Sequence, residues 1–358
     1  MTAITKNASL RHNEYYGQQE QLDELYQKSL TGKKFAKLYE RIVDEKNILL
    51  AYQNIKANTG SKTKGTDNLT IEDIVNMTNE QVIAMVRRRL IKYKPQPVKR
   101  VEIPKPNGKL RPLGIPTISD RLIQQCILQI LDPICEAKFH NHSYGFRPSR
   151  STEHAIAMMY KMINLLNLHF VVDIDIKGFF DNVNHSKLLK QMWTMGIQDK
   201  RLLCIISAML KAEIQGIGIP DKGTPQGGIL SPLLSNIVLN ELDWWISDQW
   251  ESFKTKHRYS SNRNKIRAIK SHSTLKEFYI IRYADDFKIM CRTKEVADKI
   301  FVAIKMWLKE RLHLEISKDK SKITNLRKKH SEFLGIAIKA VVKGKERIAS
   351  KYQGRGYY

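Results

Sequence analysis

The spacing of apolar residues divides the chain into helical and strand-like segments. Across residues 1–60 apolar positions recur at helical intervals, as in Gln18-Gln-Glu-Gln-Leu-Asp-Glu-Leu25, which predicts surface helices with one apolar face. Residues 121–139 carry apolar residues on most of their positions and predict a core helix. Further helices are expected at 152–166, at 200–210, from Ser231-Pro232 onward and at 294–312.

Other segments alternate with a period of two and predict strands. Residues 98–103 and 109–115 flank the turn Pro104-Lys-Pro-Asn-Gly108 and predict a hairpin. Residues 170–176 form one strand, residues 278–291 a strand, a turn and a second strand, and residues 314–316 a short last strand before a strand pair at 332–338. The order strand, helices, hairpin, helix, strand predicts an α+β fold built on the ferredoxin-like βαββαβ arrangement, whose central strands lie side by side.

Carboxylates occur where these strands would meet. Asp173 and Asp175 share one face of the strand at 170–176, and Asp285 and Asp286 lie at the tip of the later hairpin. Aspartate is a common turn residue, so the tip alone leaves a structural role open. Carboxylate oxygens are also the ligands that Mg²⁺ prefers, and adjacent acidic strands predict a divalent-metal site for phosphoryl transfer.

The charge of the chain indicates a polyanionic partner. Among 358 residues, 61 Lys and Arg face 36 Asp and Glu, giving a formal charge of +25. Nucleic acid is the expected partner. An anionic membrane surface is the alternative, but the sequence has no apolar span of about 18 residues and no secretory signal, which predicts a soluble, intracellular protein. Five cations lie on the hairpin at 98–115 and predict phosphate contacts, and the basic stretch 254–276, which has no acid, predicts an exposed and partly disordered insertion that touches RNA.

Histidines and cysteines give weaker indications. The four cysteines lie in apolar surroundings without a CxxC pair and predict small core residues. His140 and His142 lack further ligands at matching spacing, so the pair argues against a metal site. The loop that contains them is expected to stack on bases and to contact phosphates through four residues: Tyr144, Phe146, Arg147 and Arg150.

Several motifs in order resemble one enzyme family. Val172-Asp-Ile-Asp-Ile-Lys-Gly-Phe-Phe-Asp181, Thr224-Pro-Gln-Gly-Gly-Ile-Leu-Ser-Pro232 and Tyr283-Ala-Asp-Asp286 resemble the palm motifs of reverse transcriptases. Arg111-Pro-Leu-Gly-Ile-Pro-Thr117 and Ser143-Tyr-Gly-Phe-Arg-Pro148 further resemble the group II intron-encoded branch, the bacterial intron maturases. The resemblance covers about residues 60–340 and implies a right-hand polymerase fold with a helical fingers subdomain and a palm.

The resemblance implies roles for individual residues. Asp175, Asp285 and Asp286 would be catalytic and, with the Ile176 backbone carbonyl, would hold two Mg²⁺ ions, for which Mn²⁺ can substitute. Phe180 would exclude a ribose 2′-hydroxyl, and Asp173 would be structural. Lys105 and Arg111 would bind the triphosphate, Gln226 and Gly227 would line the nascent base pair, and Lys320 would donate a proton to pyrophosphate, with a solvated surface lysine as the equal alternative.

The same resemblance implies an organisation and partners. Residues 1–60 would extend the fingers, 61–168 would form the fingers with the basic hairpin, 169–340 the palm with a basic insertion at about 251–277, and 341–358 the start of a thumb or maturase domain that is otherwise absent. The chain would then be a fragment holding fingers and palm or, alternatively, a naturally short relative, and without a thumb it would retain template and primer weakly and show poor processivity. Expected partners are intron RNA, an RNA template with a DNA primer, and dNTPs, in the bacterial cytoplasm or, when DNA is the target, at the nucleoid; a homodimer is left open.

Other functions compete with polymerisation. A non-catalytic intron RNA-binding splicing cofactor is the main alternative, although the intact aspartates argue against loss of catalysis. An RNA-dependent RNA polymerase would need a residue smaller than Phe180 under the sugar. A palm-like nucleotidyl cyclase would need neither the +25 charge nor the glycine-rich loop at 223–228.

Overall fold

The computed structural model describes residues 11–104, 108 and 110–341. The expectations for Lys105, Lys109 and most of the segment 341–358 lie outside the described residues. The chain forms two compact units. Unit 1 comprises residues 1–138 and 180–237, and unit 2 comprises residues 139–179 and 238–358.

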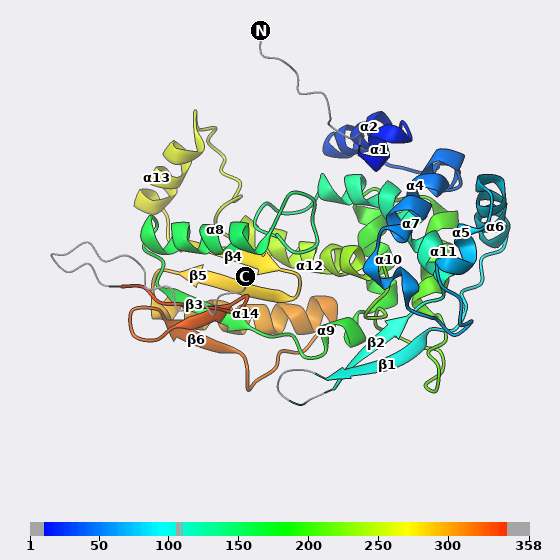
Figure 1. Cartoon of the computed structure of the whole chain (residues 1–358). Coiled ribbons are helices and arrows are strands. Elements are labelled where there is room, and N and C mark those ends of the chain that lie inside the picture. Colours follow the sequence, from blue (N-terminus) through cyan, green and yellow to red (C-terminus); the bar gives the residue numbers. More distant parts are fainter. Residues whose placement is uncertain (1–10, 105–107, 109, 342–358) are drawn as a thin grey trace, which may run out of the picture. The chain divides into compact units, whose positions relative to one another are not determined.

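Unit 1 is mainly helical and is built around helix α7 (Figure 1). Thr117 caps α7 by accepting the Asp120 backbone N–H, and the helix buries an apolar face that includes Ile127 and Ile130. Helices α2, α3, α4 and α6 pack against it. The helices of unit 1 are α1 His12–Tyr15, α2 Gln19–Leu30, α3 Tyr39–Ile42, α4 Glu45–Lys56, α5 Glu72–Val75, α6 Asn79–Ile91, α7 Ile118–Glu136, α10 His185–Thr194 and α11 Lys200–Leu210, with a 3₁₀ turn at Thr59–Lys62.

The hairpin predicted from residues 98–115 is present in unit 1. Strand β1 (Lys99–Pro104) pairs antiparallel with β2 (Leu110–Ile115), with Lys99 opposite Ile115. Strand β1 is largely exposed, whereas most residues of β2 are partly buried.

Unit 2 contains a four-stranded antiparallel sheet with the order β4-β5-β3-β6. Its strands are β3 (Phe170–Ile174), β4 (Phe278–Tyr283), β5 (Asp286–Cys291) and β6 (Lys322–Asn325). This is the strand order of the βαββαβ arrangement, so the predicted topology is confirmed. The identity of the last strand was wrong: it is β6, because Ile316 makes only an isolated bridge with Ile176.

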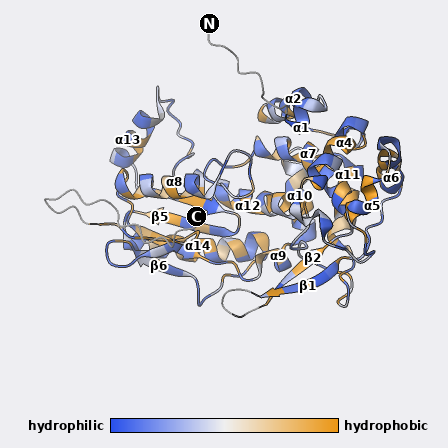
Figure 2. Ribbon diagram, in the orientation of Figure 1, coloured by the Kyte–Doolittle hydropathy of each residue, from blue (hydrophilic) through white to orange (hydrophobic). Residues whose placement is uncertain are grey.

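The two faces of this sheet carry different helices. Val171 and Met290 share one face and pack with helix α8 (Thr152–Asn164) through Ile156 and Met159. Helix α14 (Lys294–Trp307) contacts β3, β5 and β6 and continues into a short π-helix at Leu308–Leu312, whereas α8 runs above β4 and β5 in Figure 1. In Figure 2 α14 shows alternating apolar and polar patches, the pattern of a helix with one buried face.

Two shorter elements complete unit 2. Strands β7 (Ser331–Phe333) and β8 (Ile336–Ile338) form the predicted strand pair, and Phe333 and Ile338 join the α8 core. Among the described elements, two helices cross the boundary between the units. The short helix α9 (Phe179–Asn182) starts in unit 2 and ends in unit 1. Helix α12 (Ser231–Asp248) starts in unit 1 and ends in unit 2.

The structure corrects two expectations about irregular and buried residues. Part of the basic insertion forms helix α13 (Asn262–His272), which is capped by Ser261 and packs Ile266 and Ile269 against the α8 core; most of it is polar in Figure 2. Cys204 is exposed, whereas the other three cysteines are buried as expected. In the described part of the chain, no helix has the length and apolarity needed to cross a membrane.

Candidate active site

The acidic hairpin of unit 2 turns at Ala284-Asp285, between β4 and β5 (Figure 1). Ala284 has φ +56°, a left-handed conformation that is costly for a residue with a Cβ. The turn is stabilised by Arg282, which is fully buried and donates from Nη1 to the Ala284 carbonyl at 2.8 Å. Arg282 is itself paired with Asp243 of α12, at 2.8 Å from Nε to Oδ1 and 2.7 Å from Nη2 to Oδ2. A buried, bidentate ion pair therefore fixes the strained turn that presents Asp285 and Asp286.

A second acidic position lies where β3 ends. Asp175 follows the last strand residue, and its backbone is fixed on both sides, since its N–H donates to Ser321 Oγ at 3.2 Å and its carbonyl accepts the Ser317 N–H at 2.7 Å. Its carboxylate remains partly exposed and lies 3.3 Å from Lys320 Nζ. Ile176 is buried beside it and bridges to Ile316.

Asp173 has a different environment, although it lies on the same strand face. Its side chain is 6% exposed and forms a 2.8 Å ion pair with Lys288 of β5, the residue directly opposite it in the sheet. Ser331 Oγ donates to it at 2.9 Å and Thr324 Oγ1 at 3.2 Å. The carboxylate is thus neutralised and hydrogen-bonded inside the unit.

These residues surround one cavity of unit 2, with a volume of about 480 Å³. The lining is dominated by charged side chains: Asp173, Asp175, Asp285, Asp286, Glu332, Lys288, Lys320 and Lys322. Burial raises the pKa of Asp286, and the Asp285 and Asp173 carboxylates add to that shift, while Lys288, 3.6 Å away, opposes it. Five carboxylates against three lysines give the lining a negative formal charge.

The predicted metal ligands face this cavity without converging on one point. Among the described residues, three potential metal ligands whose ligand atoms all lie within 4.8 Å of one another occur outside this cavity: His140, His142 and Glu251. The aspartates supply oxygen donors of the kind that hard divalent cations take, so the donor set fits Mg²⁺.

The predicted nucleotide-binding residues belong to unit 1. Arg111 Nε donates to Gln226 Oε1 at 2.8 Å, and the Gly114 N–H donates to the Gln226 carbonyl at 2.5 Å. A Cβ on Gly227, which has φ +111°, would meet the Gly114 carbonyl oxygen at 2.6 Å, so the close approach of loop and hairpin requires glycine. Phe180 and Gln226 line a second cavity of about 280 Å³ together with Gly114.

The loop at 140–150 differs from its prediction. Tyr144 is buried, and Arg147 is 7% exposed, with its guanidinium donating to the carbonyls of His140 at 2.7 Å and Ser143 at 2.6 Å. Both residues are structural here, and the expectation that they contact bases and phosphates is corrected. Phe146 is exposed, and Arg150 donates to the Asn141 carbonyl at 2.7 Å.

Comparison with known proteins identifies the family. The family model of the reverse transcriptase (RNA-dependent DNA polymerase) matches residues 103–338, which include both acidic segments of the cavity and strand β2 of the unit 1 hairpin. The chain belongs to the reverse transcriptase family. The motifs thus fall in one continuous family domain. Its part in unit 2 carries the predicted metal ligands, and its part in unit 1 carries the predicted nucleotide-binding residues.

Two curated relatives narrow this assignment. Protein YkfC of Escherichia coli is 35% identical over 287 residues, 75% of this chain and 74% of that protein. The group II intron-encoded protein LtrA of Lactococcus lactis is 32% identical over 364 residues, 90% of this chain but only 59% of LtrA. The resemblance to group II intron-encoded reverse transcriptases and maturases is confirmed, and this reverse transcriptase spans about three fifths of the length of LtrA.

Among solved structures, a telomerase from Candida albicans in complex with a fragment of telomeric RNA aligns with a TM-score of 0.45 and 13% identity, over 70% of this chain and 45% of that chain.

Sequence reasoning missed several residues of the cavity. Two of them belong to no recognised motif. Lys288 neutralises Asp173 and approaches Asp286, and Glu332 comes from strand β7. The cross-strand register was the available signal for Lys288, because it lies directly opposite Asp173 once β3 and β5 are paired. Asp243, the partner of Arg282, lies in a helix predicted only by its apolar spacing.

Proposed function

We propose that this reverse transcriptase family member is an active RNA-directed DNA polymerase of a mobile group II intron. It would add dNTPs to a primer 3′-hydroxyl on an RNA template and would also bind intron RNA to assist splicing. The observation that carries the proposal is the cavity of unit 2, around which Asp175, Asp285 and Asp286 gather from adjacent strands. In the proposal, residues 169–340 form the palm, of which 180–237 belong to unit 1, and the hairpin of unit 1 belongs to the fingers.

The three aspartates and the Ile176 carbonyl would hold two Mg²⁺ ions, with Mn²⁺ as a substitute. When bound, such ions activate the 3′-hydroxyl and stabilise charge on the triphosphate and leaving pyrophosphate. A bound cation would stabilise the ionised form of Asp286, whose pKa is raised first by burial and then by the Asp285 and Asp173 carboxylates. Asp173 and Lys288 take no part in this chemistry: their ion pair fastens β3 to β5 and fixes the spacing of the acidic positions.

Lys320 and the residues of unit 1 would handle the substrate. Lys320 would leave the Asp175 carboxylate, 3.3 Å away, and protonate the departing pyrophosphate. Arg111 would bind the triphosphate, its hydrogen bond to Gln226 keeping the guanidinium oriented. Phe180 would exclude the 2′-hydroxyl, while Gln226 and Gly227 would line the base pair.

The strong positive charge supports the nucleic-acid partners, because Lys and Arg neutralise phosphates and give salt-dependent affinity. Under this proposal the protein works in the cytoplasm of a bacterium, and at the nucleoid when DNA is its target. A non-catalytic splicing cofactor is the second candidate and would rest on that charge alone.

Primer extension tests the proposal. The wild type, on an RNA template with a labelled DNA primer, Mg²⁺ and dNTPs, should extend the primer, and NTPs should replace dNTPs poorly. Asp285→Asn should reduce extension by at least about 100-fold, because even outer partners of metal ligands contribute about 10- to 100-fold. Asp298→Asn is the matched control, because this carboxylate of α14 is 49% exposed and pairs with Lys294 four residues earlier on the same helix.

The outcomes separate the two candidates. Extension that is lost in Asp285→Asn but kept in Asp298→Asn supports the polymerase. A wild type that binds structured RNA but extends no primer favours the splicing cofactor. Equal extension by wild type and Asp285→Asn would show that the cavity is not the polymerase site.

A further inference from the structure

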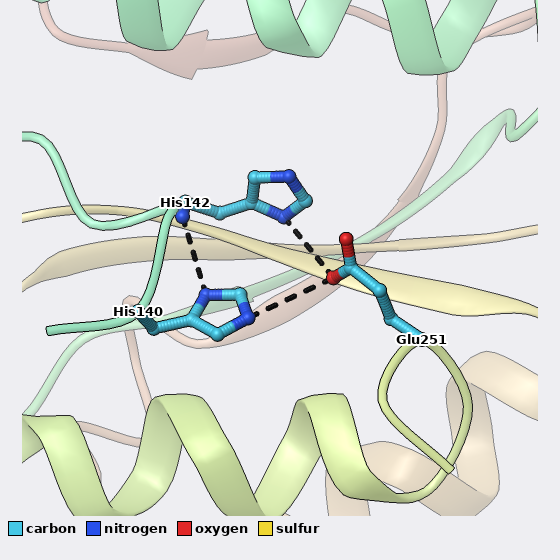
Figure 3. A group of neighbouring side chains, drawn as sticks. All are labelled: His140, His142 and Glu251. Atoms are coloured by element: carbon cyan, nitrogen blue, oxygen red, sulfur yellow. Dashed lines mark hydrogen bonds and ion pairs between the residues drawn. The ribbon is translucent and has the colours of Figure 1, made fainter. Parts of the chain in front are cut away.

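A second cluster of ligating side chains lies away from the acidic cavity, within unit 2. Figure 3 shows His140 and His142, from the loop before α8, converging with Glu251, which follows α12. Oε2 of Glu251 lies 3.7 Å from His140 Nε2 and 3.5 Å from His142 Nδ1. Both imidazoles are more than nine-tenths buried, and the Glu251 side chain is 30% exposed.

The hydrogen bonds around His142 leave one nitrogen unexplained. Its ring bonds to the Ile280 backbone carbonyl. Its Nδ1 is buried without a hydrogen-bond partner, so the bond to Ile280 comes from Nε2 and Nδ1 presents a bare lone pair in the neutral ring. This lone pair faces a carboxylate oxygen 3.5 Å away. Two acceptors facing each other in a buried site are stabilised only when a cation or a proton lies between them.

From this arrangement we infer that His140, His142 and Glu251 bind a divalent transition-metal ion, with Zn²⁺ as the best match. Two imidazoles and one carboxylate are a common zinc ligand set that leaves a fourth position for water. Tetrahedral bonds of about 2.0–2.1 Å place neighbouring ligand atoms about 3.3 Å apart, so the two observed distances to Glu251 need to shorten by only a few tenths of an ångström.

The surroundings match those of known metal-binding histidines. The His142 bond to the Ile280 carbonyl is the kind of outer contact that fixes the tautomer and orients the ring. Trp244 packs edge-on against His140 with ring centroids 5.0 Å apart and supplies an apolar wall.

One rearrangement accompanies binding. His140 Nδ1 accepts the His142 backbone N–H at 3.2 Å, so in the neutral ring Nε2 carries the proton and points toward Glu251. A metal on Nε2 moves that proton to Nδ1. The long contact to the His142 N–H is then lost, and three metal bonds replace it.

The ion would act as a structural brace. The Arg282 N–H donates to the His142 carbonyl at 2.9 Å, and the Tyr144 N–H donates to the Arg282 carbonyl at 2.8 Å. The site therefore ties the end of α12 to the loop segment that runs alongside β4. This role is independent of the proposed polymerase chemistry, because none of the three ligands lines the acidic cavity.

Metal titration of the whole chain tests the inference. Chelator-stripped protein is titrated with Co²⁺ in excess Mg²⁺, which occupies carboxylate sites but competes poorly for imidazole. We expect one Co²⁺ per chain with the visible absorption of a tetrahedral nitrogen and oxygen site, displaced by one equivalent of Zn²⁺. Zn²⁺ should also raise the melting temperature. No tetrahedral Co²⁺ spectrum in the folded wild type would overturn the inference and leave a shared proton between Glu251 and His142.

Variants locate the ion. Glu251→Gln, which keeps the side-chain shape, should weaken Zn²⁺ binding by at least about tenfold, as should His142→Asn. Glu241→Gln is the matched control, because that carboxylate is 27% exposed and lies on α12 of the same unit, and it should bind Zn²⁺ as the wild type does. Asp285→Asn should also keep the ion, which separates this inference from the polymerase proposal. Wild-type affinity in folded Glu251→Gln protein would refute the assignment.

Discussion

Replacing Arg282 with methionine should destabilise the protein strongly, because it would leave a carboxylate buried without a cation. Arg282 and Asp243 are 0% and 1% exposed and share three hydrogen bonds of 2.7 to 3.0 Å. Removing one partner of such a pair costs about 3–5 kcal/mol. The Ala284 carbonyl also loses its donor. Since the whole folding free energy of a typical domain is about 5–15 kcal/mol, Arg282→Met should lose about a fifth of it or more.

The matched control is an exposed ion pair on the same helix. Arg311 is 59% exposed and contacts Glu241 of α12 at 2.8 Å, so Arg311→Met should cost less than about 1 kcal/mol. The double variant Arg282→Met with Asp243→Leu removes both buried charges and should recover much of the loss, as well-packed apolar replacements of buried pairs often do. These comparisons separate the burial of charge from the mere loss of an arginine.

Urea unfolding followed by circular dichroism measures these differences. The midpoint of Arg282→Met should fall far below those of the wild type and of Arg311→Met, and that of the double variant should lie above the single one. The reasoning fails if Arg282→Met and Arg311→Met lower the unfolding free energy equally. It also fails if the double variant is less stable than the single one, because the loss would then come from packing.

Three further predictions concern other parts of the chain. Burial lowers the pKa of His169, with Arg327 and Arg292 adding to the effect, so the unfolded chain binds the extra proton first and stability should fall on acidification below about pH 6.5. His169→Gln should lessen that fall in urea unfolding measured from pH 8 to pH 5; parallel curves would contradict it. Gly227→Ala should lower the melting temperature more than Gly216→Ala, because both have positive φ but only Gly227 would clash with backbone. Native protein should react with a thiol reagent at Cys204 only and at four cysteines after unfolding; more than one fast thiol would contradict the burial of the others.

Local patterns in the sequence predicted the elements that local forces determine. The alternation in residues 170–176 and 278–291 predicted the strands, and the order of elements predicted the sheet topology. Helix α13 was missed because its many cations resemble a solvated segment, although Ile266 and Ile269 give it the apolar face it buries. Strand β6 was missed because Lys322-Ile-Thr-Asn325 is short and polar and pairs only by virtue of its distant partner β3.

Partners far apart in the sequence could not be predicted by such patterns. Arg147 was expected to bind phosphate because arginine in a loop is usually exposed, yet backbone carbonyls of its own loop satisfy its guanidinium in the interior. Likewise, His140 and His142 argued against a metal only while their third neighbour was unknown. Glu251 lies more than a hundred residues later, and it is the packing of the loop against the end of α12 that brings it to them.

The two aspartates of β3 show how an environment divides the roles of identical side chains. Asp173 and Asp175 point to the same side of the sheet, two residues apart, and the strand pattern treats them alike. Lys288 stands directly opposite Asp173, and two hydroxyl groups donate to the Asp173 carboxylate, so its charge is neutralised within the unit. Asp175 lies beyond the last paired residue of β3. Its carboxylate stays partly exposed and pairs with the exposed side chain of Lys320 at 3.3 Å. Replacing Asp173 with asparagine should therefore lower stability more than Asp175→Asn does, while Asp175→Asn should lower primer extension more in protein that is fully folded. The opposite ranking would mean that the inner aspartate, and not the one at the strand end, serves the proposed chemistry.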